Sequence, residues 1–308
     1  MEFRELPAEK AFREAGPVFH LYTKPLENRV LYENDQERTL ALNYLAIASM
    51  RSGARLLAYS LMSNHFHFVF AGQEAQLDAF FGDFKQLLGA YYKSHGRGGW
   101  LTGMEAGKTA ILNVGQFRAT LAYVIRNAFV VNVNVNVFAD PWSSGYLYFN
   151  PFLRKDGVSA ASLSVRERRK FTCSRPLPGV NEDIHVLEGM AQPWSFVDYK
   201  LAMSFYDHAR QYVYSVLKNV EALTEVAVSC GERPQFTDED LLPLVYKLCR
   251  EQWQAESPRA LDKKGRQQLA ILLKNKYFAS NGQIARVTRM TVPEVNELFP
   301  MAAKAQIR

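Results

Sequence analysis

The sequence predicts an α+β protein, in which a first half of mixed strands and helices precedes a second half made of helices. Runs of alternating or β-branched residues are interspersed with helical periodicity up to about residue 150, whereas only helical periodicity continues after about residue 194. The chain has 308 residues, of which 48% are hydrophobic and 13% aromatic. It is therefore long and apolar enough for one large domain or two ordinary ones.

The elements expected in the first half follow the order β-α-β-β-α-β, with one more helix after them. Strands are expected at 17–23, 54–62, 64–70 and 108–114, and helices at 35–50, 74–94 and 116–128. This order is the split β-α-β arrangement of ferredoxin-like folds, and we expect it to form a domain over residues 1–153. The valine–asparagine alternation of 130–138 also has the period of a strand, although an extended surface segment would have the same pattern.

The second half is expected to be an all-α domain over residues 194–308, joined by a linker or crossover at 154–193 that is rich in charge, proline, glycine and serine. Thr237 precedes three acidic residues and predicts a helix start. Residues 281–299 have the pattern of a helix-turn-helix, with Pro293 in the first turn of the second helix and Arg289 where a turn glycine is customary. The alternative is a small helical bundle with a solvated basic face. The basic residues of this region are Lys263, Lys264, Arg266, Lys274, Lys276, Arg286 and Arg289.

Composition narrows the functional classes. The net charge of +6 and the pI near 9.1 are compatible with a polyanionic partner but do not require one. The three cysteines lie far apart in sequence, so they indicate neither a disulfide framework nor a zinc finger. The sequence has no signal-peptide pattern and no apolar run of the roughly 20 residues that a membrane span needs. We therefore expect a cytoplasmic protein without a membrane partner.

The stretch LMSNHFHFVF at 61–70 places two histidines one residue apart in an apolar run. Because side chains alternate faces in a strand, His65 and His67 share one face and the intervening phenylalanines share the other. Two imidazoles on one strand face can bind a single metal ion. A pair of ordinary polar residues on an exposed strand face is the alternative, since a three-residue pattern is short.

The helix expected at 116–128 carries a polar stripe formed by Gln116, Thr120, Tyr123 and Asn127. Phe117, Leu121 and Val124 fall on the apolar face by the same periodicity, so Tyr123 is not placed as an ordinary core tyrosine. Asn127 lies one turn further on and can offer an amide oxygen beside the phenol. Mg²⁺ or Mn²⁺ accepts such an oxygen, and Mn²⁺ also accepts imidazole. A surface tyrosine at a helix boundary is the alternative for Tyr123.

These motifs resemble those of a known family. AYSLMSNHFHFVF (58–70) is similar to the signature of the single-tyrosine HUH transposases, and AYVIRNAFV (122–130) and DPWSSGYLYF (140–149) resemble two further segments of that family. The resemblance extends in consistent order over about residues 15–150. Within the family it is nearest to the branch associated with repeated extragenic palindromes.

The resemblance implies a ferredoxin-like catalytic domain that cleaves and rejoins single-stranded DNA through a covalent 5′-phosphotyrosine. Carried over to this sequence, Tyr123 is the nucleophile, His65 and His67 are metal ligands, and Asn127 is the third ligand of Mg²⁺ or Mn²⁺. The implied partner is single-stranded or hairpin DNA of a palindromic repeat element, which would associate the protein with the nucleoid. Relatives include both homodimers and monomers, so a homodimer is one assembly that the resemblance implies.

The sequence also departs from the family. Ala128 replaces the usual proline after the asparagine, and LTGMEAGK (101–108) lacks an expected arginine. These changes leave open a domesticated protein that binds hairpin DNA or RNA with little or no catalysis. An unrelated HxH metalloenzyme acting on small molecules would need more acidic ligands. The residues expected to contact nucleic acid are Tyr91, Tyr92, Arg97, Arg126, Arg286 and Arg289; the two tyrosines, which can stack on bases, are also the rival nucleophiles.

Overall fold

The computed structural model describes residues 6–26, 29–131, 136–173, 183–218, 220–234 and 236–300. The chain folds into two compact units, Met1–Val216 and Leu217–Arg308. The division falls later than the expected start of a helical domain at residue 194. The reason is that α6 (Tyr199–Ser204) and the residue after it pack in the first unit, where the Phe205 ring lies 4.7 Å from that of Phe117.

The first unit is built on an antiparallel sheet whose strands have the order β2-β3-β1-β4. The strands are β1 (Val18–Thr23), β2 (Arg55–Leu61), β3 (Phe66–Ala71) and β4 (Ala106–Ile111). The helices around them are α1 (Pro7–Glu14), α2 (Asp35–Ser52), α3 (Glu74–Ser94) and α4 (Val114–Val131). The predicted β-α-β-β-α-β order is therefore present. β4 ends earlier than expected because the Asn113 side chain accepts from Gln116 N and starts α4.

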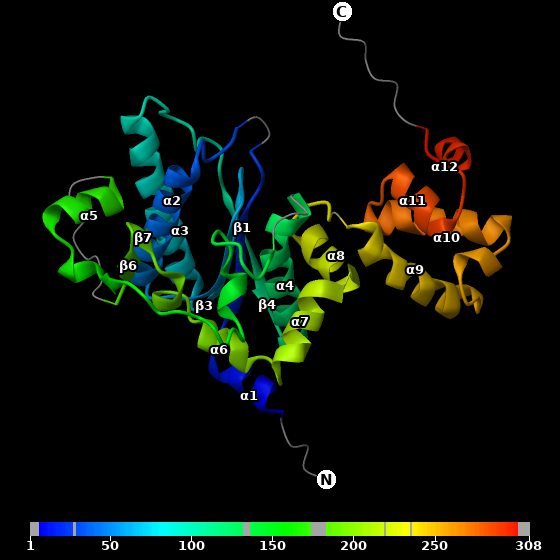
Figure 1. The fold of residues 1–308 in the computed structure, drawn as a ribbon, viewed down its shortest axis with the longest axis horizontal. Helices are drawn as coiled ribbons and strands as arrows, with labels where there is room; N and C mark the ends of the chain where they lie inside the picture. Colours follow the sequence, from blue (N-terminus) through cyan, green and yellow to red (C-terminus); the bar gives the residue numbers. More distant parts are fainter. Residues whose placement is uncertain are drawn as a thin grey trace, which may run out of the picture. The chain divides into compact units, whose positions relative to one another are not determined.

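The alternation predicted for 64–70 divides the two faces of the sheet. Phe66 and Phe68 point to the layer of α2 and α3, where the Phe68 ring lies 5.1 Å from that of Phe80 and 5.7 Å from that of Phe84. Phe66 and Phe68 are 0% exposed. His67 points to the opposite face, toward α4. Figure 1 shows α2 and α3 side by side, with β1 between this layer and α4. Burial of the phenylalanine face thus fixes the direction of the histidines.

The segment expected to be a linker is folded where the structure describes it. It contains α5 (Val165–Thr172), β5 (Val158–Ser159), β6 (His185–Leu187), β7 (Met190–Ala191) and the 3₁₀ turns Ala160–Ser162 and Pro193–Ser195. A buried side chain of α2 holds this region: Asn43 Nδ2 donates to Phe171 O and Gly189 O at 2.8 and 2.9 Å, and its Oδ1 accepts from Ala191 N at 2.8 Å. These parts are therefore ordered by long-range pairing that is not visible in composition; residues 174–182 lie outside the described ranges.

The segment after α4 covers one edge of the sheet. Leu61 N of β2 donates to Trp142 O at 2.9 Å, and Tyr59 N donates to Ser144 Oγ at 3.1 Å. A 3₁₀ turn follows at Ser144–Leu147. Gly145 is required there, since a Cβ atom would lie 2.3 Å from Val137 O. Of the strand expected at 130–138, the first two residues belong to α4, 132–135 lie outside the described residues, and 136–138 lead into a turn.

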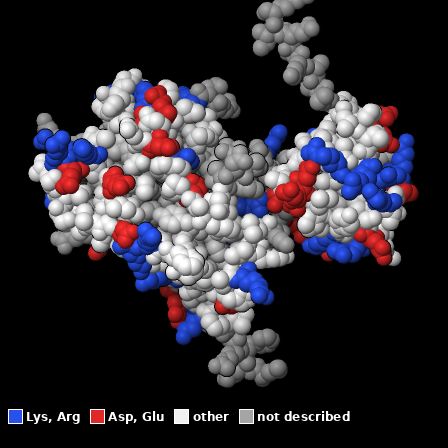
Figure 2. Space-filling model, viewed as in Figure 1, with Lys and Arg blue, Asp and Glu red and all other residues white. Residues whose placement is uncertain are grey.

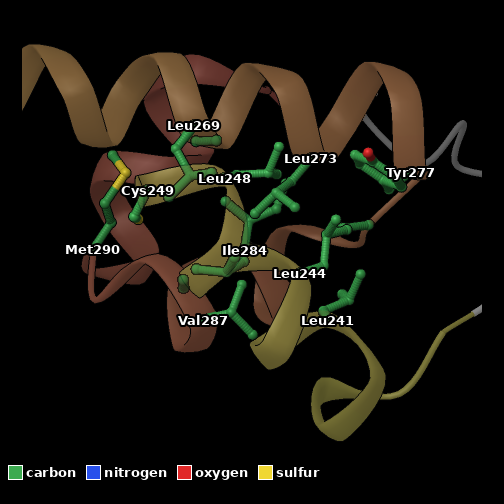
Figure 3. Close-up of a cluster of buried hydrophobic side chains, with 14 of the residues drawn as sticks. Leu241, Leu244, Leu248, Cys249, Leu269, Leu273, Tyr277, Ile284, Val287 and Met290 are labelled. Carbon is green, nitrogen blue, oxygen red and sulfur yellow. The ribbon is translucent and has the colours of Figure 1, made fainter. Parts of the chain in front are cut away.

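The second unit is helical in the residues that the structure describes. Its helices are α8 (Val220–Ser229), α9 (Asp238–Trp253), α10 (Lys263–Tyr277), α11 (Asn281–Thr288) and α12 (Val292–Leu298), with a 3₁₀ turn at Pro258–Ala260; α7 (Ala209–Lys218) leads into it. Thr237 caps α9 as predicted, with its hydroxyl accepting from Asp240 N. Leucines of α9 and α10 pack against Ile284 and Val287 of α11 to form one core (Figure 3). In neither unit is any described helix both long and apolar enough to form a bilayer-crossing segment.

Candidate active site

The two histidines of the HxH motif lie together on the α4 side of the sheet. His67 belongs to β3 and is 0% exposed, while His65 immediately precedes the strand and is 8% exposed. Their ring centroids are 4.9 Å apart, and their ligating nitrogen atoms lie within 4.8 Å of each other. One ion can therefore be reached by both imidazoles, as the strand alternation predicted.

Each of these histidines has a hydrogen-bond partner at Nδ1. His65 Nδ1 lies 2.8 Å from Asn64 Oδ1, and His67 Nδ1 lies 3.1 Å from His20 Nε2. Because an amide oxygen only accepts, His65 donates from Nδ1, and Nε2 is then the ring nitrogen that carries the lone pair. Partners of this kind fix the tautomer and the orientation of metal-ligating histidines.

α4 brings the predicted nucleophile to the same place. The Tyr123 ring centroid is 5.4 Å from that of His67 in an edge-on contact, and the side chain is 6% exposed. The opposite face of the helix holds it there, since Phe117 packs against Phe205. The polar stripe predicted from helical periodicity therefore faces the histidines at Tyr123, while Phe117, Leu121 and Val124 are fully buried on the other faces.

Asn127 occupies the next turn of α4 on the side of Tyr123. Its side chain is 8% exposed, and its Nδ2 atom is buried without a hydrogen-bond partner among the described residues. Rotating the amide by half a turn, which exchanges Oδ1 and Nδ2, would place a carbonyl oxygen at that position. Two imidazole nitrogens and one amide oxygen are donors that suit Mn²⁺, and the oxygen also suits Mg²⁺. The residues present thus fit a divalent cation.

Three of the residues expected to contact nucleic acid lie in a separate cluster around Glu37 of α2. Arg97 pairs with Glu37, with one of its two hydrogen bonds at 3.2 Å, and its guanidinium lies 4.8 Å from the centroid of the Tyr92 ring. The Tyr91 hydroxyl donates to Glu37 Oε1 at 3.3 Å. Tyr92 is 1% exposed, and its hydroxyl donates to Leu31 O. This cluster fastens the end of α3 to the start of α2.

The environment of the two rival nucleophiles opposes ionisation. Partial burial, together with the negative charge of Glu37, raises the pKa of Tyr91. Burial likewise raises the pKa of Tyr92. Burial alone would also raise the pKa of Glu37, but hydrogen bonds from Arg97 and from Glu33 N outweigh it and lower that pKa, so Glu37 is a carboxylate. A tyrosine whose phenolate is disfavoured is a poor nucleophile.

The remaining arginines of the prediction lie elsewhere. Arg126 of α4 is 4% exposed, and its Nη1 donates to Val216 O at 2.9 Å. In the second unit, exposed Arg286 pairs with Asp238, with one contact at 3.1 Å. Arg289 is exposed and lies in the left-handed conformation, with φ of 61°, between α11 and α12. Their roles in nucleic-acid binding stay predictions.

Two residues at this site were not identified from the sequence as functional, His20 and Asn64. In the sequence, His20 has no partner at a recognisable spacing. The alternation of 18–23 does place it on the same face as Tyr22, but only the strand register shows that this face is shared with His67. Asn64 stands next to His65 in the motif, and that adjacency is the available signal.

Comparison with known proteins adds a distant structural likeness. No known protein-family model matches the chain, and no curated protein matches it. A solved structure, a REP-associated tyrosine transposase bound to a REP hairpin, aligns with a TM-score of 0.33 and 15% sequence identity. The alignment covers 48% of this chain and 84% of the other.

Proposed function

We propose that the protein is a metal-dependent, single-tyrosine transposase that cleaves and rejoins single-stranded DNA. The observation that carries this proposal is the position of Tyr123 against His67 in a cluster that also contains His65. The HxH and tyrosine-helix motifs support it by their resemblance to the HUH family. The order of the elements and the antiparallel β2-β3-β1-β4 sheet support a ferredoxin-like catalytic domain.

In the proposed reaction, the phenol oxygen of Tyr123 attacks the scissile phosphorus. A bond from Tyr123 Oη to phosphorus forms, and the bond from phosphorus to the 3′-oxygen breaks. The phenol proton passes to solvent, and the departing oxygen takes up a proton to become a 3′-hydroxyl. The phosphotyrosyl linkage is itself a phosphodiester, so it conserves the energy of the bond that was cleaved. A second 3′-hydroxyl can therefore reverse the step and join a new strand without ATP.

His65, His67 and Asn127 would hold the cation in this proposal. When bound, a divalent cation supplies Lewis-acid polarisation of the scissile phosphate. The pKa of a phenol is ordinarily about 10, so attack at neutral pH requires such activation of the phosphate or loss of the phenol proton. The burial of Tyr123 against the His67 ring restricts the rotation of the phenol, which reduces the entropy lost on attack.

The proposal predicts a covalent protein–DNA adduct that depends on metal. Hairpin oligonucleotides with randomised single-stranded flanks and a 3′-terminal fluorophore are incubated with the full chain and Mn²⁺ or Mg²⁺. Because the 5′-phosphate side stays on the tyrosine, the fluorophore should migrate with the protein through a denaturing gel, and EDTA should remove the band. If the hairpins bind but no adduct forms with either metal, the chain is a hairpin-binding protein without this catalysis.

We also propose that the second unit binds duplex or hairpin DNA through a helix-turn-helix made of α11 and α12. The two helices enclose a three-residue turn, and Thr291 caps the second helix, which carries Pro293 in its first turn. Lys and Arg side chains gather over α10 and α11 on the face seen in Figure 2. Arg289 extends from the turn itself, where phosphate contact is expected, and is exposed.

Replacing Arg289 by glycine should weaken DNA binding without destabilising the fold. Glycine removes the strain of a positive φ, which should stabilise the turn by about 1 kcal/mol. Loss of one phosphate contact should make the plot of log association constant against log salt concentration less steep, by about 1 unit of slope, for a duplex of random sequence. Fluorescence anisotropy across a salt series measures the slope.

Arg286→Gln is the matched comparison for this experiment. Its guanidinium already pairs with Asp238, so its replacement should change the slope less than Arg289→Gly does. An unchanged slope and affinity in Arg289→Gly would remove Arg289 from the DNA interface.

A further inference from the structure

We propose that His20 is a positioning residue that selects the tautomer of His67 and thereby prepares it to bind metal. This inference rests on the proposed function, since it concerns the same metal site. The first step is the register of the sheet. β1 pairs with β3 so that Tyr22 lies opposite His67 and His20 lies opposite Val69. His20 is therefore diagonal to His67 on the face that looks toward α4.

The second step is the contact between the two rings. His20 Nε2 and His67 Nδ1 are 3.1 Å apart, and the rings are nearly parallel, with centroids 5.3 Å apart. His20 is 1% exposed and His67 is 0% exposed. A hydrogen bond between these two nitrogens needs one proton and one lone pair, so one ring must donate and the other must accept.

The third step assigns the proton. A histidine that binds a cation through Nε2 must keep that lone pair, so His67 carries its proton on Nδ1 and donates it to His20. His20 is then the acceptor through Nε2 and carries its own proton on Nδ1. The alternative tautomer of His67 would place a proton on Nε2 and block coordination. His20 therefore does for His67 what the Asn64 carbonyl does for His65.

His20 also contacts the nucleophile helix. Its ring centroid is 6.2 Å from that of Tyr123, in an edge-on arrangement, and 5.1 Å from that of Tyr22. The ring thus lies within reach of both the metal-ligand strand and the tyrosine. His20 contacts His67 at Nδ1, which is the ring nitrogen of His67 that would not bind the metal. The effect of His20 on metal affinity therefore passes through His67.

Two substitutions separate this role from simple packing. His20→Phe keeps an aromatic ring of similar size but cannot accept a hydrogen bond, whereas His20→Gln keeps an acceptor near the position of Nε2. Mn²⁺ affinity, measured by isothermal titration calorimetry on the full chain, should fall 10- to 100-fold in His20→Phe. It should stay within about threefold of wild type in His20→Gln, because the glutamine oxygen can still accept the hydrogen bond from His67 Nδ1.

Nitrogen-15 NMR of the histidine rings gives a readout that needs no metal. In the metal-free wild type, His67 should carry its proton on Nδ1, and this preference should be lost in His20→Phe. Equal Mn²⁺ affinity in His20→Phe and wild type, or equal loss in both His20 variants, would overturn the inference, as would a proton on His67 Nε2 in the wild type. If the wild type binds no Mn²⁺ but His67 keeps the Nδ1 proton, the metal-dependent function fails and the pairing by His20 stands.

Discussion

Tyr123→Phe should abolish the covalent DNA adduct while leaving hairpin affinity unchanged. The substitution removes only the hydroxyl oxygen, and the ring should keep its edge-on contact with His67. Without that oxygen no phosphotyrosyl bond can form, so the adduct yield should fall below detection rather than by a modest factor. The adduct assay measures the chemistry, and anisotropy with the same hairpins measures binding.

Tyr91→Phe is the control for this experiment, because Tyr91 is the rival nucleophile that is partly exposed. Its hydroxyl donates to Glu37, and its raised pKa disfavours the phenolate. The variant should therefore retain the adduct. If adduct formation persists in Tyr123→Phe and disappears in Tyr91→Phe, the active site lies at the end of α3 and the assignment to α4 is incorrect.

Phe68→Ala should lower the free energy of unfolding of the first unit by about 3–5 kcal/mol. Phe68 is 0% exposed, and its ring lies between Phe66 and Phe70 of its own strand and the two phenylalanines of α3. Its removal leaves a cavity that these rings cannot close without leaving their packed positions. Three of the four tryptophans belong to the first unit. Trp253 belongs to the second unit, so denaturant unfolding followed by tryptophan fluorescence in a Trp253→Phe background reports on the first unit alone.

Phe152→Ala is the matched control for the core substitution. The same group is removed, but Phe152 is 86% exposed, so the free energy of unfolding should change by less than about 0.5 kcal/mol. A similar loss in both variants would show that the phenylalanine face of β3 does not form the core of the unit.

The fold of the first half was predictable because its signals are local. Helix α3 spans the predicted residues, since its apolar positions repeat with the helical period from Glu74 to Ser94. Strand alternation likewise placed Phe68 in the core and His67 on the other face. The folding of 154–193 was not predictable, because Asn43 contacts Phe171 and Gly189 across more than a hundred residues and these contacts leave no local period.

The grouping of three candidate-site residues could be predicted from the same kind of local signal. His65, His67 and Tyr123 follow from alternation, helical periodicity and family resemblance. His20 does not, because alternation indicates which face of β1 carries His20 but not which residue of β3 lies beside it, and its contact with His67 depends on that pairing. Tyr92 was expected to stack on a base, but only the tertiary structure shows its ring under Arg97 and its hydroxyl on Leu31 O.

The segment that covers the β2 edge has a consequence for the order of events during synthesis. Backbone groups of Leu61 and Tyr59 find their partners at Trp142 and Ser144, more than 80 residues later in the chain. Until the ribosome has released that segment, β2 is an open edge that can pair with another nascent chain. We therefore expect residues 142–144 to close this edge of the sheet late in synthesis, and a pause in translation before residue 142 should favour aggregation.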